Sequence, residues 1–336
     1  MKIAVDAMGG DNAPKVVVQG AFQAASEWGM DITLVGDRDA ISHELGEDLG
    51  RAPVGVHHCE EVVYMDESPL KAVRQKKDSS IMVAFDLIKR GEADAVVSAG
   101  NSGATLAAGV LTLGRVEGVE RPALAGIFPG DKNEVILIDV GATVDCRPIH
   151  LFQFGIMAHA FATSCLGVDD PKIGLLSIGE EGSKGNEQVR LAHDLFRASS
   201  LNFVGNVEGR DIFTGETTII VCDGFVGNVA LKLSEGMAEA ISKMLKDELM
   251  GSLVGKAGLL FGRRSFQRFK KRLDYAEYGG APILGINGIG IVCHGSSSAR
   301  AIRSAVKMAA SYVKKNIQER LSLQMEDFQT MMASAS

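Results

Sequence analysis

Four polar side chains in this chain have types that suit the handling of an anion: Asn101, Lys184, Asn228 and His294. Each lies in a glycine-containing segment that follows an apolar run. A lysine supplies a compact positive charge, an asparagine supplies amide N–H donors, and a histidine can orient a substrate or give up a proton. Glycine lets a backbone turn sharply and approach a ligand closely. We interpret the four as candidate catalytic residues.

The segments around these residues predict a cradle for phosphate. Asn101-Ser102-Gly103 opens an apolar helical pattern, and Gly227-Asn228 stands before another. Free N–H groups at a helix start attract anions. An ordinary helix cap, a surface lysine paired with Glu180 or Glu181, and a structural histidine remain alternatives. The predicted phosphate or substrate contacts are Asp6, Gly9, Gly10, Asp11, Ser102, Gly103, Gly185, Asn186, Gly227 and Ser296.

The first of these segments is "VDAMGGDNAP", residues 5–14. It follows a short apolar run and contains two carboxylates, a glycine pair and a proline. Bare carboxylates repel phosphate, so we expect Asp6 and Asp11 to tie the loop to nearby N–H groups. The segment then shapes the floor of a site and does not perform its chemistry.

Strand-like apolar runs alternate along the chain with helical patterns. Continuously apolar strands separated by helices are typical of a mostly parallel sheet with helices on both faces, an α/β fold. Such sheets bind ligands at the carboxyl ends of their strands. The predicted strands are 2–5, 32–37, 93–101, 135–139, 172–179, 203–206 and 218–224, and the predicted helices are 16–27, 81–90, 151–165, 187–199 and 229–250.

Composition excludes several classes of protein. The 336 residues are 46% hydrophobic and carry a net charge of −7, which disfavours nucleic acid as a partner. The five cysteines lack C-x-x-C spacing, so we expect neither a disulfide framework nor a zinc site. This cysteine content is typical of a protein in a reducing cytoplasm. The chain has no P-loop and no H-E-x-x-H motif, and we expect no metal and no cofactor.

Residues 251–273 are basic and apolar at once. They contain seven Lys or Arg and no acid, within a chain of net charge −7. A basic amphipathic segment suits an anionic membrane surface, an acidic partner protein or a solvated helix on its own core. Of these we predict peripheral membrane binding. The predicted docking residues are Leu260, Phe261, Arg263, Arg264, Phe266, Phe269 and Lys271.

Seven segments in order resemble the PlsX family of bacterial phosphate acyltransferases. They are "VDAMGGDNAP", "SAGNSGA", "DVGATVD", "IGEEGSKGNE", "NFVGNVEGRD", "DGFVGNVALK" and "YGGAPILGINGIGIVCHGSS". Ser102 and Thr143 stand where many members have threonine and asparagine. The resemblance implies a three-layer α/β/α sandwich like that of phosphotransacetylases and isopropylmalate dehydrogenases. It also implies one domain over 1–322, with the basic amphipathic helical insert at about 236–275 and a tail at 323–336.

The implied reaction transfers a fatty acyl group from acyl-acyl carrier protein to inorganic phosphate for phospholipid synthesis. Lys184 would then neutralise phosphate or oxyanion charge, Asn101 and Asn228 would donate hydrogen bonds, and His294 would act as orienter or acid. The implied partners are the carrier protein, a second copy of the chain and a membrane glycerol-3-phosphate acyltransferase downstream. The implied location is the cytoplasmic face of the cell membrane. An acyl-coenzyme A donor, a metal-dependent dehydrogenase on the same fold and a non-catalytic scaffold are the alternatives.

Overall fold

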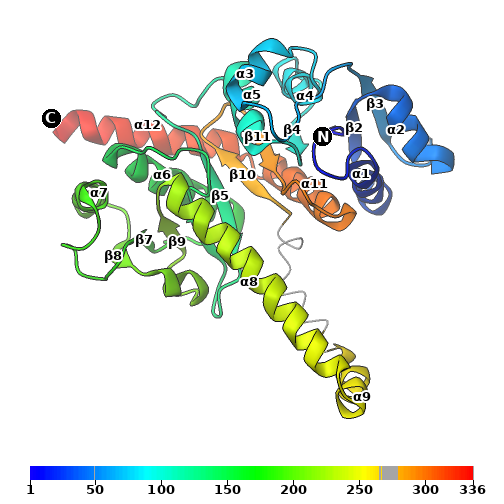
Figure 1. Ribbon diagram of the computed structural model, residues 1–336. Helices are drawn as coiled ribbons and strands as arrows, with labels where there is room; N and C mark the ends of the chain where they lie inside the picture. Colours follow the sequence, from blue (N-terminus) through cyan, green and yellow to red (C-terminus); the bar gives the residue numbers. More distant parts are fainter. Residues whose placement is uncertain (49, 265, 267–278, 336) are drawn as a thin grey trace.

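The described strands form a central sheet of eleven strands in which apolar side chains alternate between two buried faces (Figure 1). In the computed structural model, which describes residues 1–48, 50–264, 266 and 279–335, Ile3 and Val5 contact one core and Ala4 contacts the other. This alternation follows from the two-residue period of a strand. The strand order is β3 (Val54–His58), β2 (Asp31–Gly36), β1 (Lys2–Asp6), β4 (Ala95–Ser98), β11 (Ile289–Val292), β10 (Ala281–Leu284), β5 (Ala123–Phe128), β6 (Val135–Ile138), β9 (Ile219–Val221), β7 (Ile173–Leu176) and β8 (Phe203–Val207).

Helices cover both faces, so the predicted three-layer α/β/α class is confirmed. One core receives side chains from α1 (Lys15–Trp28), α2 (Arg38–Leu45), α6 (Pro148–Phe161), α7 (Glu187–Arg197), α11 (Ala299–Lys314) and α12 (Ile317–Ala335). The other receives side chains from α3 (Pro69–Gln75), α4 (Ser80–Lys89), α5 (Ser102–Leu113) and the start of α8 (Gly224–Met250). Four of the five predicted helices match observed ones to within a few residues; the fifth, 229–250, begins earlier, at Gly224.

The two halves of the sheet run in opposite directions, and two central strands set their stagger. β1, β2, β3, β4 and β11 are parallel to one another, as are β6, β9, β7 and β8; β10 and β5 pair antiparallel between them. Val292, which ends β11, pairs with Ala281 at the start of β10. Ile138, which ends β6, pairs with Ala125 of β5. The neighbouring residue of β5, Leu124, pairs with Ile283 of β10. The carboxyl ends of both halves therefore meet at nearly the same level.

Helix α8 begins at this level and extends away from the sheet, with α9 (Leu253–Phe261) at its far end (Figure 1). The predicted insert at about 236–275 includes the second half of α8 and all of α9. The predicted division at residue 322 falls inside α12, whose Met325 is fully buried and whose Phe328 packs edge-on against Phe152. The last helix thus belongs to the core layer.

One described segment, Pro148–Leu166, is long and apolar enough to cross a membrane. It comprises α6 and the π-helical turn that follows, and 72% of its apolar window is buried inside the protein. Because α6 packs against the sheet, α7 and α12, this segment is a core helix.

Candidate active site

A cleft of about 270 Å³ opens where the carboxyl ends of the two half-sheets meet. This volume is close to the lower end of the range of small-molecule sites. Apolar side chains form much of its wall, including Leu124, Ile127, Val140, Leu231 and Val292. Its polar lining comes from both halves of the chain: Ser102, Asn228, Lys232, Glu235 and His294.

Helix α5 presents its N-terminus to this cleft. Asn101 is the N-cap, and its Oδ1 accepts a hydrogen bond from the Ala104 N–H at 3.1 Å. Ser102 and Gly103 are the next two residues, so their N–H groups have no acceptor within the helix, and Ser102 lines the cleft. The helix dipole adds partial positive charge at the same point. The phosphate cradle predicted here is therefore geometrically available.

Asn101 also holds a neighbouring loop in place. Its Nδ2 donates to the carbonyl oxygens of Met65 at 3.0 Å and Glu67 at 3.2 Å. Both amide hydrogens are thus engaged by backbone in this structure. A catalytic role for Asn101 stays a prediction. In this structure its side chain holds the loop that contains Met65 and Glu67 against the start of α5.

The N-terminus of α8 differs from the one predicted. The turn expected at Gly227-Asn228 is helical, because the helix begins three residues earlier with Asp223 as its cap. The Asp223 carboxylate accepts the N–H groups of Phe225 at 3.0 Å and Val226 at 2.9 Å. This carboxylate occupies the position that an anion would take. Asn228 instead reaches the cleft as a side chain on the first turns of α8.

Buried Asp139 anchors the loop that α8 packs against. Its two oxygens accept hydrogen bonds from the N–H groups of Leu124, Gly141, Ala142 and Thr143 at 2.7–3.1 Å. Burial outweighs these contacts and raises the pKa of Asp139 to about 6. A Cβ on Gly227 would lie 1.8 Å from the Asp139 carbonyl oxygen, so only glycine permits this approach.

Asp6 plays the corresponding part in the first half of the chain. It accepts a hydrogen bond from the Ser98 hydroxyl at 2.7 Å, and Ser98 Oγ accepts the Gly100 N–H at 3.0 Å. Burial raises the pKa of Asp6. A Cβ on Gly9 would lie 2.5 Å from the Asp6 carboxylate, so the glycine lets the first loop cross directly above it. Asp6 thus shapes the loop that leads into α5, and its Oδ1 also accepts the Met8 N–H of the first loop at 3.3 Å.

The rest of the first loop contacts the loop after β11. Gly10 has φ +114°, a conformation that favours glycine, and the Asp11 N–H donates to the Gly295 carbonyl at 2.8 Å. The Asp11 carboxylate lies beside Gly295. This loop therefore supports the segment that carries His294.

His294 lies between the two halves of the cleft. Its Nδ1 is 2.8 Å from Ser296 Oγ and accepts the Ser296 N–H at 3.2 Å. Its Nε2 is 3.8 Å from the Glu235 carboxylate on α8. The helix that follows begins at Ala299 with Ser298 as its cap, so Ser296 serves the histidine and not a helix N-terminus.

Lys184 is not among the residues that line the cleft. It is exposed on the loop after β7, where its own N–H donates to the Glu181 carbonyl at 2.9 Å. β7 neighbours β9, which leads into α8, so the loop lies at the same edge of the sheet. Gly185 has φ +96°, and Asn186 caps α7 through the Val189 N–H. The catalytic role of Lys184 stays a prediction.

Lys232 and Glu235 are cleft residues that the sequence interpretation missed. With Asn228 they stand at positions i, i+4 and i+7, which share one face of a helix. The predicted helix 229–250 already contained Lys232 and Glu235, and the start at Asp223 adds Asn228 to the same face. Cys293 also lines the cleft, but burial raises the pKa of its thiol to about 12, so it remains protonated.

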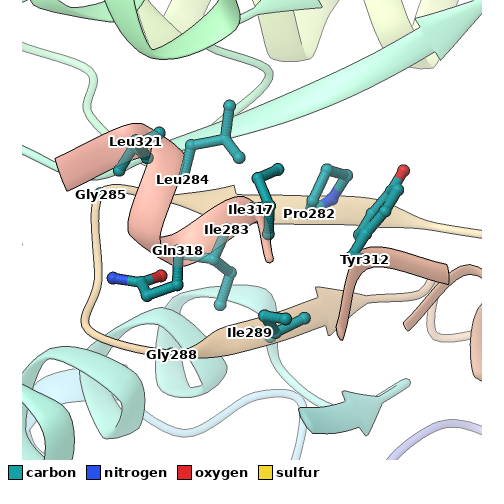
Figure 2. Close-up of a pocket in the computed structure, with 11 residues that line it drawn as sticks. Pro282, Ile283, Leu284, Gly285, Gly288, Ile289, Tyr312, Ile317, Gln318 and Leu321 are labelled. Atoms are coloured by element: carbon teal, nitrogen blue, oxygen red, sulfur yellow. The ribbon is translucent and has the colours of Figure 1, made fainter. Parts of the chain in front are cut away.

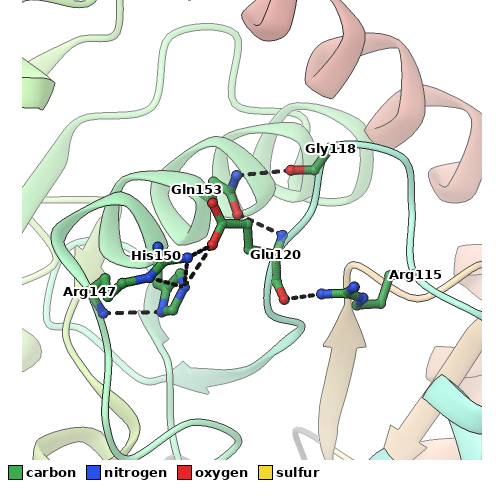
Figure 3. Close-up of polar contacts among 6 residues, drawn as sticks. All are labelled: Arg115, Gly118, Glu120, Arg147, His150 and Gln153. Atoms are coloured by element: carbon green, nitrogen blue, oxygen red, sulfur yellow. Dashed lines mark hydrogen bonds and ion pairs between the residues drawn. The ribbon is translucent and has the colours of Figure 1, made fainter.

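A polar cluster fixes the loop before β5 to α6 (Figure 3). The Glu120 carboxylate contacts Arg147 and His150, and the Glu120 N–H donates to Gln153 at 2.9 Å. Gln153 in turn donates to the Gly118 carbonyl at 2.9 Å. Burial, followed by the charges of Arg147 and Arg121, lowers the pKa of His150. These contacts are local and position β5, one wall of the cleft.

A separate cavity lies between the β10–β11 hairpin and helices α11 and α12 (Figure 2). Its lining includes Ile283, Leu284, Ile289, Ile317 and Leu321, and none of the described residues around it carries a charge. This cavity has no groups for acid–base or anion chemistry. Nor does the described part of the chain gather three or more His, Cys, Asp or Glu side chains that could hold a metal ion.

Comparison with known proteins identifies the family of this chain. A family model described as "Fatty acid synthesis protein" matches residues 1–320. The chain belongs to this family. The resemblance to the PlsX phosphate acyltransferases is thereby confirmed, and the protein is an acyltransferase of that family.

Two relatives named phosphate acyltransferase cover nearly the whole chain. The protein from Geobacter sulfurreducens is 54% identical over 327 residues, which are 97% of this chain and 94% of the relative. The protein from Nitratidesulfovibrio vulgaris is 56% identical over 321 residues, covering 95% and 93%.

Solved structures show the same fold at low identity. A phosphotransacetylase from Streptococcus pyogenes has a TM-score of 0.62 at 18% identity and covers 94% of each chain. A 4-hydroxythreonine-4-phosphate dehydrogenase from Klebsiella pneumoniae has a TM-score of 0.54 at 14% identity, covering 93% of this chain and 99% of its own. These likenesses confirm the fold class expected from the resemblance.

Substitution of Asp139 by asparagine tests its anchoring role. The new amide would face backbone N–H donors, so we expect the free energy of unfolding at pH 7 to fall by about 2–4 kcal/mol. Urea denaturation measures this change. Because burial raises the Asp139 pKa above its unfolded value, its contribution to stability falls as pH rises from about 4 to about 6. Asp139→Asn removes that pH dependence.

The matched control is Asp145→Asn on the same loop. Asp145 is exposed, so its substitution is expected to change stability by less than about 0.5 kcal/mol. Equal stability of wild type and Asp139→Asn at pH 7 would show that the buried carboxylate does not hold the loop.

Proposed function

We propose that the protein transfers the fatty acyl group of an acyl-acyl carrier protein to inorganic phosphate. The observation that carries this proposal is the cleft, which unites the open N-terminus of α5 with Asn228 and His294 beside an apolar wall. Family membership supplies the reaction class, a phosphate acyltransferase. The product, an acyl phosphate, would serve a membrane glycerol-3-phosphate acyltransferase in phospholipid synthesis.

This reaction depends more on positioning the two substrates and stabilising negative charge than on a strong base. Phosphate is already a nucleophile near neutral pH, and a thiol with a pKa near 8.5 is an adequate leaving group. The site must desolvate the anion, place it beside the thioester carbonyl and stabilise the developing oxyanion. The N–H groups of Ser102 and Gly103 suit the anion, and the Asn228 amide suits the oxyanion.

The far end of α8 provides a surface for the membrane or the carrier protein. Val254 is 83% exposed and Phe261 is 89% exposed, and Lys256, Arg263 and Arg264 beside them are exposed cations. This combination supports peripheral binding at the cytoplasmic face of an anionic membrane. Of the other predicted docking residues, Phe266 is half-buried, the Leu260 side chain is not described, and Phe269 and Lys271 lie outside the described residues.

The middle of α8 provides a second surface, which supports a homodimer. Its exposed apolar side chains repeat every three or four residues along one face: Val226, Val229, Leu233, Met237, Ile241 and Met244. Such a stripe on a helix is typical of a buried interface. A second copy of the chain would cover it.

The first prediction from this proposed function concerns the reaction. Incubation with long-chain acyl-acyl carrier protein and phosphate should yield a product that hydroxylamine traps as acyl hydroxamate, in a phosphate-dependent way. Lys184→Ala should lower turnover on the order of 10²-fold if its charge serves phosphate or the oxyanion. Lys172→Ala, at an exposed lysine just before strand β7, is the control and should retain turnover.

The outcomes separate the candidate functions. Product from the coenzyme A thioester alone would favour a phosphotransacetylase-like enzyme over the carrier-protein reaction. An inactive wild type with both donors would leave the non-catalytic scaffold. Intact turnover in Lys184→Ala would remove that residue from the mechanism.

The second prediction concerns the membrane. Arg263→Glu with Arg264→Glu should reduce flotation with anionic phospholipid vesicles at least tenfold, because each basic residue near such a surface contributes about 1 kcal/mol. Lys89→Glu with Arg90→Glu at the end of α4 is the control. Unchanged flotation together with a raised KM for the acyl carrier protein would assign the surface to that protein.

The third prediction concerns assembly. The wild type should sediment as a dimer, and Leu233→Glu with Met237→Glu should sediment as a monomer, because an interface would bury unpaired carboxylates. Leu191→Glu on α7, where the leucine is 49% exposed, should remain dimeric. A monomeric wild type at micromolar concentration would rule out the proposed dimer.

A further inference from the structure

Glu235 and His294 face one another across the cleft from opposite halves of the sheet. Glu235 Oε2 lies 3.8 Å from His294 Nε2. Glu235 stands two turns after Asn228 on α8, so both side chains point to the same wall. The Glu235 side chain is 18% exposed and that of His294 is 39% exposed. The pair is therefore partly desolvated yet open to a bound substrate.

Ser296 contacts Nδ1 of the His294 ring, so the proton that can be exchanged with a substrate is the one on Nε2. Its N–H donates to Nδ1 at 3.2 Å when Nδ1 lacks a hydrogen, and its Oγ at 2.8 Å accepts a hydrogen bond when Nδ1 carries one. Nδ1 thus has a partner in every protonation state of the ring. The proton that can change hands is the one at Nε2, which faces Glu235 and the cleft.

Other charged groups surround the pair. Lys232 and Glu239 flank Glu235 on α8, and the Asp11 carboxylate approaches from the first loop beside Gly295. Burial raises the pKa of Glu235, while His294 and then Lys232 oppose that rise. A carboxylate that is costly to bury gains most from a charged imidazole beside it.

We propose that His294 protonates the departing sulfur from Nε2 and that Glu235 is the positioning residue that stabilises its imidazolium form. This inference rests on the proposed acyl transfer to phosphate. A phosphate oxygen bonds to the carbonyl carbon, the C–S bond breaks, and its electron pair leaves with sulfur. Sulfur takes the Nε2 proton, and Nε2 then recovers a proton from the remaining phosphate hydroxyl. One proton thus passes from phosphate to thiol, and the reaction balances without a further reagent.

The test is the pH dependence of turnover in Glu235→Gln. Loss of the carboxylate makes the imidazolium less stable, so the alkaline limb of the kcat profile should move to lower pH by about one unit. At pH 8 kcat should fall about tenfold, while the KM for phosphate stays within about twofold. Glu239→Gln, one turn further along α8 and outside the cleft lining, is the matched control and should keep the wild-type profile.

A second measurement needs no activity. In the substrate-free protein, the NMR titration midpoint of the His294 ring should move to lower pH in Glu235→Gln and stay in place in Glu239→Gln. His294→Gln assigns the signal. An unmoved midpoint, or a wild-type pH profile in Glu235→Gln, would overturn the pairing. A shifted midpoint in a protein that forms no acyl phosphate from either donor would uphold the pairing and reject the proposed reaction.

Discussion

Hydrogen bonding between β5 and β10 determines where every polar group of the cleft can lie. Parallel strands deliver their loops to one edge, and the two half-sheets point in opposite directions. Without an offset, the loops after β1, β4 and β11 would lie far from those after β6 and β9. The register of β10 with β11 and β5, and of β5 with β6, brings the ends of both halves to one level. The helix starts, His294 and the face of α8 all depend on that offset.

Two buried carboxylates fix the loops at this level, one in each half of the sheet. The helix starts beside them differ in whether their N–H groups are available to an anion. Asp6 holds the segment leading into α5, and Asp139 holds the segment against which α8 begins. The start of α5 keeps N–H groups available, whereas Asp223 fills the start of α8. Anion binding is thus favoured in the first half, and the second half contributes side chains: an amide, a lysine and a carboxylate. This division suits a reaction in which one substrate is an anion and the other a neutral thioester.

The sequence was sufficient for the fold class, most of the elements and the family, because buried strands and glycine turns leave local patterns. It was not sufficient for the start of α8. Gly227 looks like a turn residue, but its role is to let a helix touch the Asp139 carbonyl, and that contact is not local. Glu235 lay inside the predicted helix 229–250, but which face of that helix meets the cleft depends on residues far apart in the chain. The two hydrogen bonds from Asn101 Nδ2 to the carbonyls of Met65 and Glu67 join residues far apart in the chain, so no local pattern predicts them.

Helix α8 joins two surfaces that would otherwise be independent. It is continuous over 27 residues, about 40 Å, and its first four turns carry Asn228, Lys232 and Glu235 while its last turn leads to α9. His294 and Ser102, in contrast, are attached to the ends of β11 and β4. Because α8 is one continuous helix, α9 and the three cleft side chains belong to a single element, while the other wall of the cleft belongs to the sheet. The cleft therefore forms between an element that reaches far from the core and elements that are fixed in it.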